Sequence, residues 1–140
     1  DYARIVNDAH HERLRSLYET ALESGARAAA GATCRPGERY IAPTILTDVP
    51  GDARIMQEEI FGPVLPVLRF SSLDEVLDGI NSRSKPLALY LFSRSKENTE
   101  RVLANTSAGG TCINDLMLHK DHTKIFILFS ERSQKIRYRF

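Results

Sequence analysis

The chain has 140 residues, of which 42% are hydrophobic and 26% are charged, and these values indicate one globular domain. A net charge of +1 gives no reason to expect nucleic acid as a partner, and two cysteines are too few for a disulfide framework. No apolar run approaches the roughly 20 residues of a membrane span, and the N-terminus does not resemble a signal peptide. We therefore expect a cytoplasmic location.

The charge is spread unevenly along the chain. Residues 1–118 carry 13 Lys and Arg against 16 Asp and Glu, whereas residues 119–140 carry six against two. A basic end of this kind is usually solvated or disordered. A second expectation is peripheral contact with an anionic surface such as a membrane.

The first half of the chain predicts a helix followed by short strands. Residues 8–24 have apolar side chains at the one-face helical spacing, and Gly25 ends the helix. Residues 26–38 are predicted to be a loop with a short strand at residues 28–30. A strand over residues 40–46 is interrupted by Pro43, which indicates a sheet edge or a bulge. The apolar helix positions are Leu14, Leu17, Tyr18, Ala21 and Leu22.

The second half alternates strands and helices. Ser72 and Glu75 form a capping box, with Glu75 reaching back to the cap, and Val102 and Leu103 are expected to face inward from the last helix. Strands and helices that alternate with brief links predict an α/β fold, here a partial parallel sheet with flanking helices. The predicted strands are residues 64–70, 87–92 and 111–114, and the predicted helices begin at residue 73 and at residue 96. The apolar segment 125–129 could add a strand to one edge.

The chemistry centres on residues 57–68, where two carboxylates precede an apolar segment bent by glycine and proline. Glu59 lies beside Phe61, and a carboxylate there can accept two hydrogen bonds from the vicinal hydroxyls of a sugar, as acidic side chains do for nucleotide ribose. The alternative is a solvated turn formed by Glu58 and Glu59, with Phe61 in the core.

The Gln-Glu-Glu-Ile-Phe-Gly-Pro sequence from residue 57 resembles the signature of the aldehyde dehydrogenase superfamily. Residues 39–49, 85–93 and 106–110 resemble its flanking stretches in order and spacing, and residues 85–93 with the Asn114–Asp115 pair resemble the class 3 branch. The resemblance implies a fragment of the catalytic domain over residues 1–118 and a divergent basic tail over residues 119–140.

The same resemblance assigns roles to three side chains. It implies that Glu59 binds the nicotinamide ribose of NAD or NADP, that Phe61 packs near the nicotinamide, and that Asn114 lies near the substrate tunnel. For Asn114, an amide that satisfies loop backbone is an equal alternative. The parent enzyme would be a homodimer that oxidises an aldehyde to a carboxylic acid through a cysteine thiohemiacetal.

No catalytic residue is expected within this chain. In the family, the nucleophilic cysteine and the glutamate base lie upstream of the stretch that matches residue 1. Cys34 lies in a loop beside Arg35, which could lower its pKa, and Cys112 is expected to be a small core residue. The chain also lacks a glycine-rich dinucleotide fingerprint. We expect it to be inactive alone; the alternative is a non-catalytic module that packs on full-length subunits or an anionic surface.

We expect no metal site. His119, Asp121 and His122 are only three candidate ligands, and the resembled family uses no metal. The segment His10-His11-Glu12 is expected to be exposed helix surface, because adjacent residues do not share a helix face.

Overall fold

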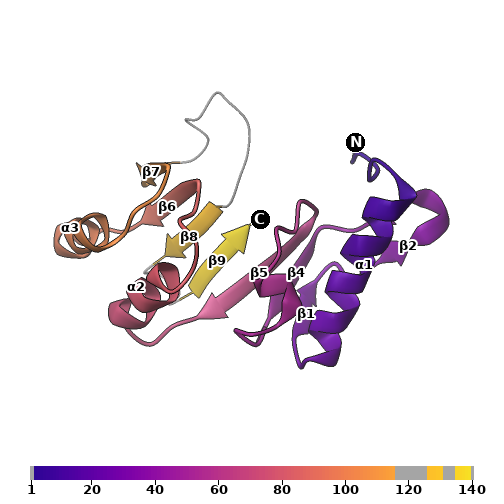
Figure 1. The fold of residues 1–140 in the computed structure, drawn as a ribbon, viewed down its shortest axis with the longest axis horizontal. Coiled ribbons are helices and arrows are strands. Elements are labelled where there is room, and N and C mark those ends of the chain that lie inside the picture. Colours follow the sequence, from indigo (N-terminus) through magenta and orange to yellow (C-terminus); the bar gives the residue numbers. More distant parts are fainter. Residues whose placement is uncertain (1, 116–125, 131–134, 140) are drawn as a thin grey trace. The chain divides into compact units, whose positions relative to one another are not determined.

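The computed structural model describes residues 2–115, 126–130 and 135–139. Contacts divide the chain into two compact units, Asp1–Val67 and Leu68–Arg139, and each unit is described by itself (Figure 1). The expectations for residues 119–125, including the boundary at residue 118 and the three candidate metal ligands, lie outside the described residues.

The first unit begins with helix α1 (Asp8–Glu23), which confirms the predicted helix. The Asn7 side chain caps it by accepting a hydrogen bond from the backbone N–H of His10 at 2.8 Å. Gly25 follows with φ of +107°, a left-handed conformation that glycine adopts without strain. The buried face of the helix consists of His11, Leu14, Leu17 and Ala21.

Burial of His11 corrects the prediction that residues 10–12 are exposed helix surface. His11 is only 3% exposed, because it precedes Leu14 by three residues and extends the apolar stripe by one turn. Its Nε2 atom lies 3.4 Å from the carbonyl oxygen of Tyr40, so burial does not leave the ring without a polar neighbour.

The strands of the first unit form two small sheets. Strand β4 (Thr44–Thr47) pairs antiparallel with β1 (Arg27–Ala30) and parallel with β5 (Val64–Arg69). Strand β2 (Cys34–Arg35) pairs antiparallel with β3 (Tyr40–Ile41). The extended segment is interrupted at Pro43, between β3 and β4, as predicted. Two 3-10 turns, η1 (Pro36–Glu38) and η2 (Arg54–Met56), complete the unit. Its core includes Leu14, Leu17, Leu46, Ile55 and Ile60.

The second unit is built around strand β6 (Ala88–Phe92), which is buried along most of its length. It pairs in parallel with β7 (Gly110–Ile113) on one side and with β8 (Phe126–Ser130) on the other, and β8 pairs antiparallel with β9 (Lys135–Arg139) (Figure 1). The apolar segment near residue 125 therefore does add a strand. Both pairs made by β6 are parallel, as predicted, and the β8–β9 pair is antiparallel.

Two helices complete this unit, α2 (Leu73–Asn81) and α3 (Lys96–Asn105). Ser72 caps α2 through a hydrogen bond from the N–H of Glu75, and the Glu75 carboxylate reaches back to accept from the N–H and hydroxyl of Ser71. Hydrogen bonds from Ser71 and from the Ser72 backbone lower the pKa of Glu75. In α3, Val102 is buried, whereas Leu103 is 48% exposed, so the prediction for Leu103 was wrong.

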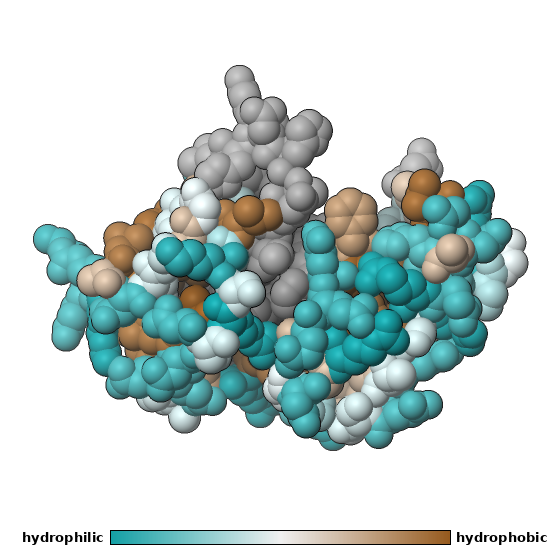
Figure 2. Space-filling view, viewed as in Figure 1, coloured by the Kyte–Doolittle hydropathy of each residue, from teal (hydrophilic) through white to brown (hydrophobic). Residues whose placement is uncertain are grey.

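Hydrophilic residues cover most of the face seen in Figure 2, and hydrophobic residues lie in separate patches. Within the described part of the chain, six large hydrophobic residues are exposed: Tyr2, Val6, Ile45, Phe61, Leu87 and Leu103. No helix there is long and apolar enough to cross a membrane.

Candidate functional site

The segment that carries Glu59 and Phe61 links η2 to β5 and has no regular secondary structure. Ile60 anchors it, because this side chain is completely buried in the core of the first unit. Phe61 is 59% exposed and has φ of +47°, so the alternative in which Phe61 is a core residue is excluded. The left-handed backbone is uncommon for a bulky residue and indicates that neighbouring groups hold the segment.

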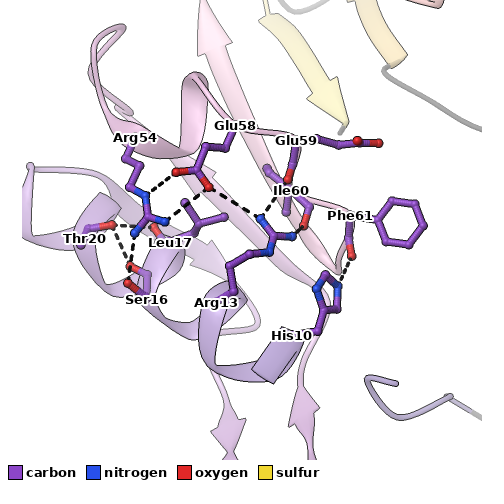
Figure 3. Close-up of polar contacts among 10 residues, drawn as sticks. All are labelled: His10, Arg13, Ser16, Leu17, Thr20, Arg54, Glu58, Glu59, Ile60 and Phe61. Atoms are coloured by element: carbon purple, nitrogen blue, oxygen red, sulfur yellow. Dashed lines mark hydrogen bonds and ion pairs between the residues drawn. The ribbon is translucent and has the colours of Figure 1, made fainter. Parts of the chain in front are cut away.

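Two side chains from α1 hold this segment by its backbone (Figure 3). The guanidinium of Arg13 donates to the carbonyl oxygens of Glu59 at 3.1 Å and Ile60 at 2.6 Å. The Nε2 atom of His10 lies 2.9 Å from the carbonyl oxygen of Phe61. The rings of His10 and Phe61 meet edge to face, with centroids 6.1 Å apart. Three consecutive carbonyls are therefore bound by one face of one helix.

Glu58 belongs to a charged cluster beneath the segment. Arg54 donates to its carboxylate from Nε at 2.5 Å and from Nη2 at 3.4 Å, and Arg13 lies 3.8 Å away. The hydrogen bond from Arg54 lowers the pKa of Glu58; burial opposes this shift, and the charges of Arg54 and Arg13 add to it. Glu58 is thus an ionised carboxylate with a structural role.

Unlike the carboxylate of Glu58, that of Glu59 is not bound by Arg13 or Arg54. Its side chain is exposed, and its carboxylate has no hydrogen-bond or ion-pair partner among the described residues. Figure 3 shows the side chains of Glu59 and Phe61 pointing away from the Arg13–Arg54–Glu58 cluster, on the same side of the segment. The site therefore presents one free anionic acceptor and one exposed aromatic ring.

Asn114 follows β7 and has φ of +55°. Its side-chain amide forms two hydrogen bonds to the backbone of Ser93, accepting from the N–H at 2.9 Å and donating to the carbonyl at 2.9 Å. Asn114 thus joins the end of β7 to the residue after β6. A role near substrate stays a prediction.

The two cysteines have different surroundings. Cys112 is buried at 8% exposure beside Ala88 and Tyr90, which confirms the core prediction. Cys34 is partly exposed, and its Sγ lies 3.6 Å from Nε2 of His11. Burial raises the pKa of Cys34 and outweighs the attraction of Arg15.

The expectation that Arg35 would lower the pKa of Cys34 was therefore wrong. The Arg35 guanidinium instead lies over the Tyr40 ring, 5.4 Å from its centroid, and near the Glu38 carboxylate. Sequence proximity to Cys34 did not bring the two side chains together. Across residues 2–115 there is no group of three or more His, Cys, Asp and Glu side chains that could hold a metal ion.

The sequence analysis missed His10, Arg13 and Arg54 as parts of the site. A usable signal was present for the first two, because residues three apart share a helix face and both carry donors. Nothing in the sequence indicated which segment that face would meet.

A family profile described as "Aldehyde dehydrogenase family" matches residues 1–126. The chain therefore belongs to the aldehyde dehydrogenase family. It is 47% identical over 119 residues to aldehyde dehydrogenase family 3 member A2 of Mus musculus, covering 85% of this chain and 24% of that protein. It is 45% identical over 119 residues to the dimeric NADP-preferring aldehyde dehydrogenase of Rattus norvegicus, covering 85% of this chain and 25% of that protein.

Solved structures agree with these sequence matches. The chain superimposes on the substrate-bound aldehyde dehydrogenase AldH of Staphylococcus aureus with a TM-score of 0.78 and 49% identity, covering 85% of this chain and 25% of that one. The chain thus spans about a quarter of the length of these relatives, and its α/β fold is a fragment of theirs.

Proposed function

We propose that this chain supplies part of the nicotinamide nucleotide site of an enzyme that oxidises aldehydes to carboxylic acids. In this proposal Glu59 accepts hydrogen bonds from the ribose hydroxyls next to the nicotinamide, and the Phe61 ring packs beside the nicotinamide. Asn114 is assigned to the substrate side of the same enzyme. The observation that carries the proposal is the contrast between Glu58, bound by arginines, and Glu59, whose carboxylate has no partner in residues 2–115.

The side chains of Glu59 and Phe61 fit such a nucleotide. Carboxylate oxygens only accept hydrogen bonds, and vicinal hydroxyls offer two donors at matching spacing. An exposed aromatic ring beside that acceptor offers an apolar face to a flat ring, and Phe61 is held there by its backbone rather than by burial. When bound, the nucleotide supplies the hydride acceptor for aldehyde oxidation. This fit applies equally to NAD and NADP.

The thiol that attacks the aldehyde is proposed to lie on a segment other than residues 2–115. An attacking cysteine needs a low pKa to be a thiolate at neutral pH. Burial has the opposite effect on Cys34, and Cys112 is packed in the core of the second unit. We also propose that the parent enzyme is a homodimer, which accords with the name of the dimeric rat relative. Its location is proposed to be the cytoplasm.

The test is a chimera in which residues 2–115 replace the matching segment of the Staphylococcus aureus enzyme. Glu59→Gln should weaken nucleotide binding or slow hydride transfer by about 10- to 100-fold, the loss expected for one hydrogen bond to a charged group. Its thermal unfolding should be unchanged. Stopped-flow kinetics with a deuterated aldehyde would measure the hydride step.

Glu58→Gln is the matched control, because it makes the same chemical change one residue away. It should lower the unfolding temperature and affect nucleotide binding less than Glu59→Gln does. If Glu59→Gln leaves both nucleotide affinity and the hydride rate unchanged, Glu59 belongs to a solvated turn and the proposal fails.

A further inference from the structure

Glu59 and Phe61 have no helix or strand of their own to fix their direction, so their geometry must come from neighbouring elements. We propose that His10 and Arg13 are positioning residues, which hold the backbone of residues 59–61 so that the two side chains point toward the nucleotide. This inference rests on the proposed function of Glu59. It assigns the orientation of the site to one face of α1.

Arg13 fixes the first part of the segment. Its planar guanidinium presents donors in a rigid fork, and the fork binds two successive carbonyls, at 3.1 Å for Glu59 and 2.6 Å for Ile60. A donor pair of fixed geometry sets the orientation of the peptide that joins these residues. A lysine would keep the charge but lose that geometry.

His10 fixes the second part. Phe61 adopts φ of +47° although its side chain is 59% exposed, so packing of the ring in a core does not hold this conformation. The contact of His10 Nε2 with the Phe61 carbonyl at 2.9 Å requires that Nε2 carry a proton, because a carbonyl only accepts. This hydrogen bond and the edge-to-face ring contact both act on the left-handed residue.

The same helix face also contacts the segment through apolar groups. A side chain placed on Gly62 would begin 2.6 Å from the Leu14 methyl groups, so glycine permits this close approach. Leu14 and Ile60 are both almost fully buried. Residues 10, 13 and 14 thus contact residues 59–62, and a displacement of α1 would move the carboxylate of Glu59.

The kinetic experiment uses the same chimera with His10→Ala, Arg13→Ala and Arg13→Lys. Each should raise the nucleotide Kd by about three- to tenfold, the fold-change of one or two ordinary hydrogen bonds. The KM for the aldehyde should change less than the KM for the nucleotide. Arg13→Lys should resemble Arg13→Ala, because the fork rather than the charge is required.

Arg15→Ala is the matched control on the same helix. Arg15 forms ion pairs with Glu12 and Glu19 and makes no hydrogen bond or ion pair with residues 59–61, so its removal should leave the nucleotide Kd unchanged. If Arg15→Ala weakens nucleotide binding as much as Arg13→Ala does, the effect is one of helix stability and the positioning role is overturned.

A double-mutant cycle separates positioning from a merely structural role. If Arg13 acts through Glu59, then Arg13→Ala should cost little nucleotide affinity once Glu59→Gln is present, so the two effects are not additive. Additive effects overturn the inference. If Glu59→Gln weakens binding but His10→Ala and Arg13→Ala do not, the positioning role fails while the proposed function stands. If Glu59→Gln has no effect, both fail.

A second measurement does not depend on activity of the chimera. In the folded chimera, backbone NMR order parameters of residues 59–61 should fall below about 0.6 in His10→Ala and Arg13→Ala, toward the range of flexible backbone. They should keep their original values in Arg15→Ala. Rigid residues 59–61 in both alanine variants would overturn the inference.

Discussion

Two adjacent glutamates show how local contacts divide roles between chemically identical side chains. Glu58 turns toward Arg54 and Arg13, and Glu59 turns away from them (Figure 3). Because an arginine pair holds one carboxylate ionised and bound, it cannot also serve a ligand without a competing cost. The neighbouring carboxylate keeps its acceptor capacity. The cluster thus decides which of the two residues is available.

This division predicts a pH effect that belongs to Glu58. Its pKa is lowered in the folded state, first by the hydrogen bond from Arg54, so its ion pairs stabilise the fold above the ordinary pKa of 4.5. That stabilisation is lost as the pH falls through the lowered pKa. Glu58→Gln should therefore lower the unfolding temperature at pH 7, and the difference from the parent chain should shrink below about pH 4.5. Thermal unfolding from pH 7 to pH 2 measures it.

Arg54 provides the reciprocal check. Arg54→Gln removes the largest cause of the lowered pKa and should give a similar shallow pH dependence. The effect should be modest, because Glu58 is 37% exposed and water screens the pair. A difference between parent and Glu58→Gln that grows at low pH would have the wrong sign and would contradict this assignment.

For single residues, the sequence indicated which side chains belong to the site, but it said less about the groups that surround them. The motif named Glu59 and Phe61, but the donors that hold their backbone come from a helix more than 40 residues away. A contact of that separation leaves no local pattern. Burial of His11 could have been read from its spacing to Leu14. The raised pKa of Cys34 could not be read from the sequence, because it depends on burial of the thiol in the fold rather than on Arg35.

At the level of secondary structure, the close contact at Gly109, in the turn before β7, predicts that a side chain there would destabilise the chain. A Cβ on Gly109 would lie 2.6 Å from the backbone carbonyl oxygen of Leu87, which no side-chain rotation can relieve. The backbone N–H of Gly110 already donates to that oxygen at 2.9 Å. Gly109→Ala should therefore destabilise the chain by about 1–3 kcal/mol, the usual cost of overpacking. Urea denaturation of the chimera that carries residues 2–115 measures the loss.

Gly37→Ala is the comparison variant, because a Cβ there meets nothing within 4 Å. Its free energy of unfolding should change by no more than about 0.5 kcal/mol, as for other surface substitutions. Equal losses in the two variants would show that the close approach at Leu87 does not limit the turn.

Helices and strands with strong patterns were the most predictable elements. The helices at residues 8 and 96 and the strand after Pro63 lie where periodicity and caps placed them. Leu103 was misplaced because adjacent helix positions point about 100° apart, so Val102 and Leu103 cannot share one narrow buried stripe. The sequence analysis also missed that β1 pairs antiparallel with β4 and that β9 pairs antiparallel with β8, since strand direction depends on distant partners.

For the whole chain, we predict no dehydrogenase turnover with common aldehydes when the 140 residues are assayed alone. Burial raises the pKa of Cys34, Cys112 is packed in the core of the second unit, and the fold is about a quarter of the length of its relatives. The measurement is production of reduced nucleotide over a buffer control. Turnover that disappears in Cys34→Ser or Cys112→Ser would show that the chain carries its own nucleophile.

The last prediction concerns the folding of the 140-residue chain by itself. Val6 is 74% exposed, and Leu87 and Leu103 are each 48% exposed, so apolar surface is open to solvent on both units. Strand β1 is exposed at all four residues and, among the described strands, pairs only with β4. Exposed apolar surface and an open strand edge favour association with other chains.

We therefore expect the isolated chain to bind a hydrophobic dye, to unfold over a broad temperature range and to elute as more than one species. Replacing Ala29 in β1 with lysine should reduce self-association, because a charge on an edge strand opposes pairing with another chain. Chromatography with light scattering at several concentrations, together with dye fluorescence, tests both statements. A sharp cooperative transition from a monomer that binds no dye would contradict the prediction and would show that the two units cover their own apolar surface.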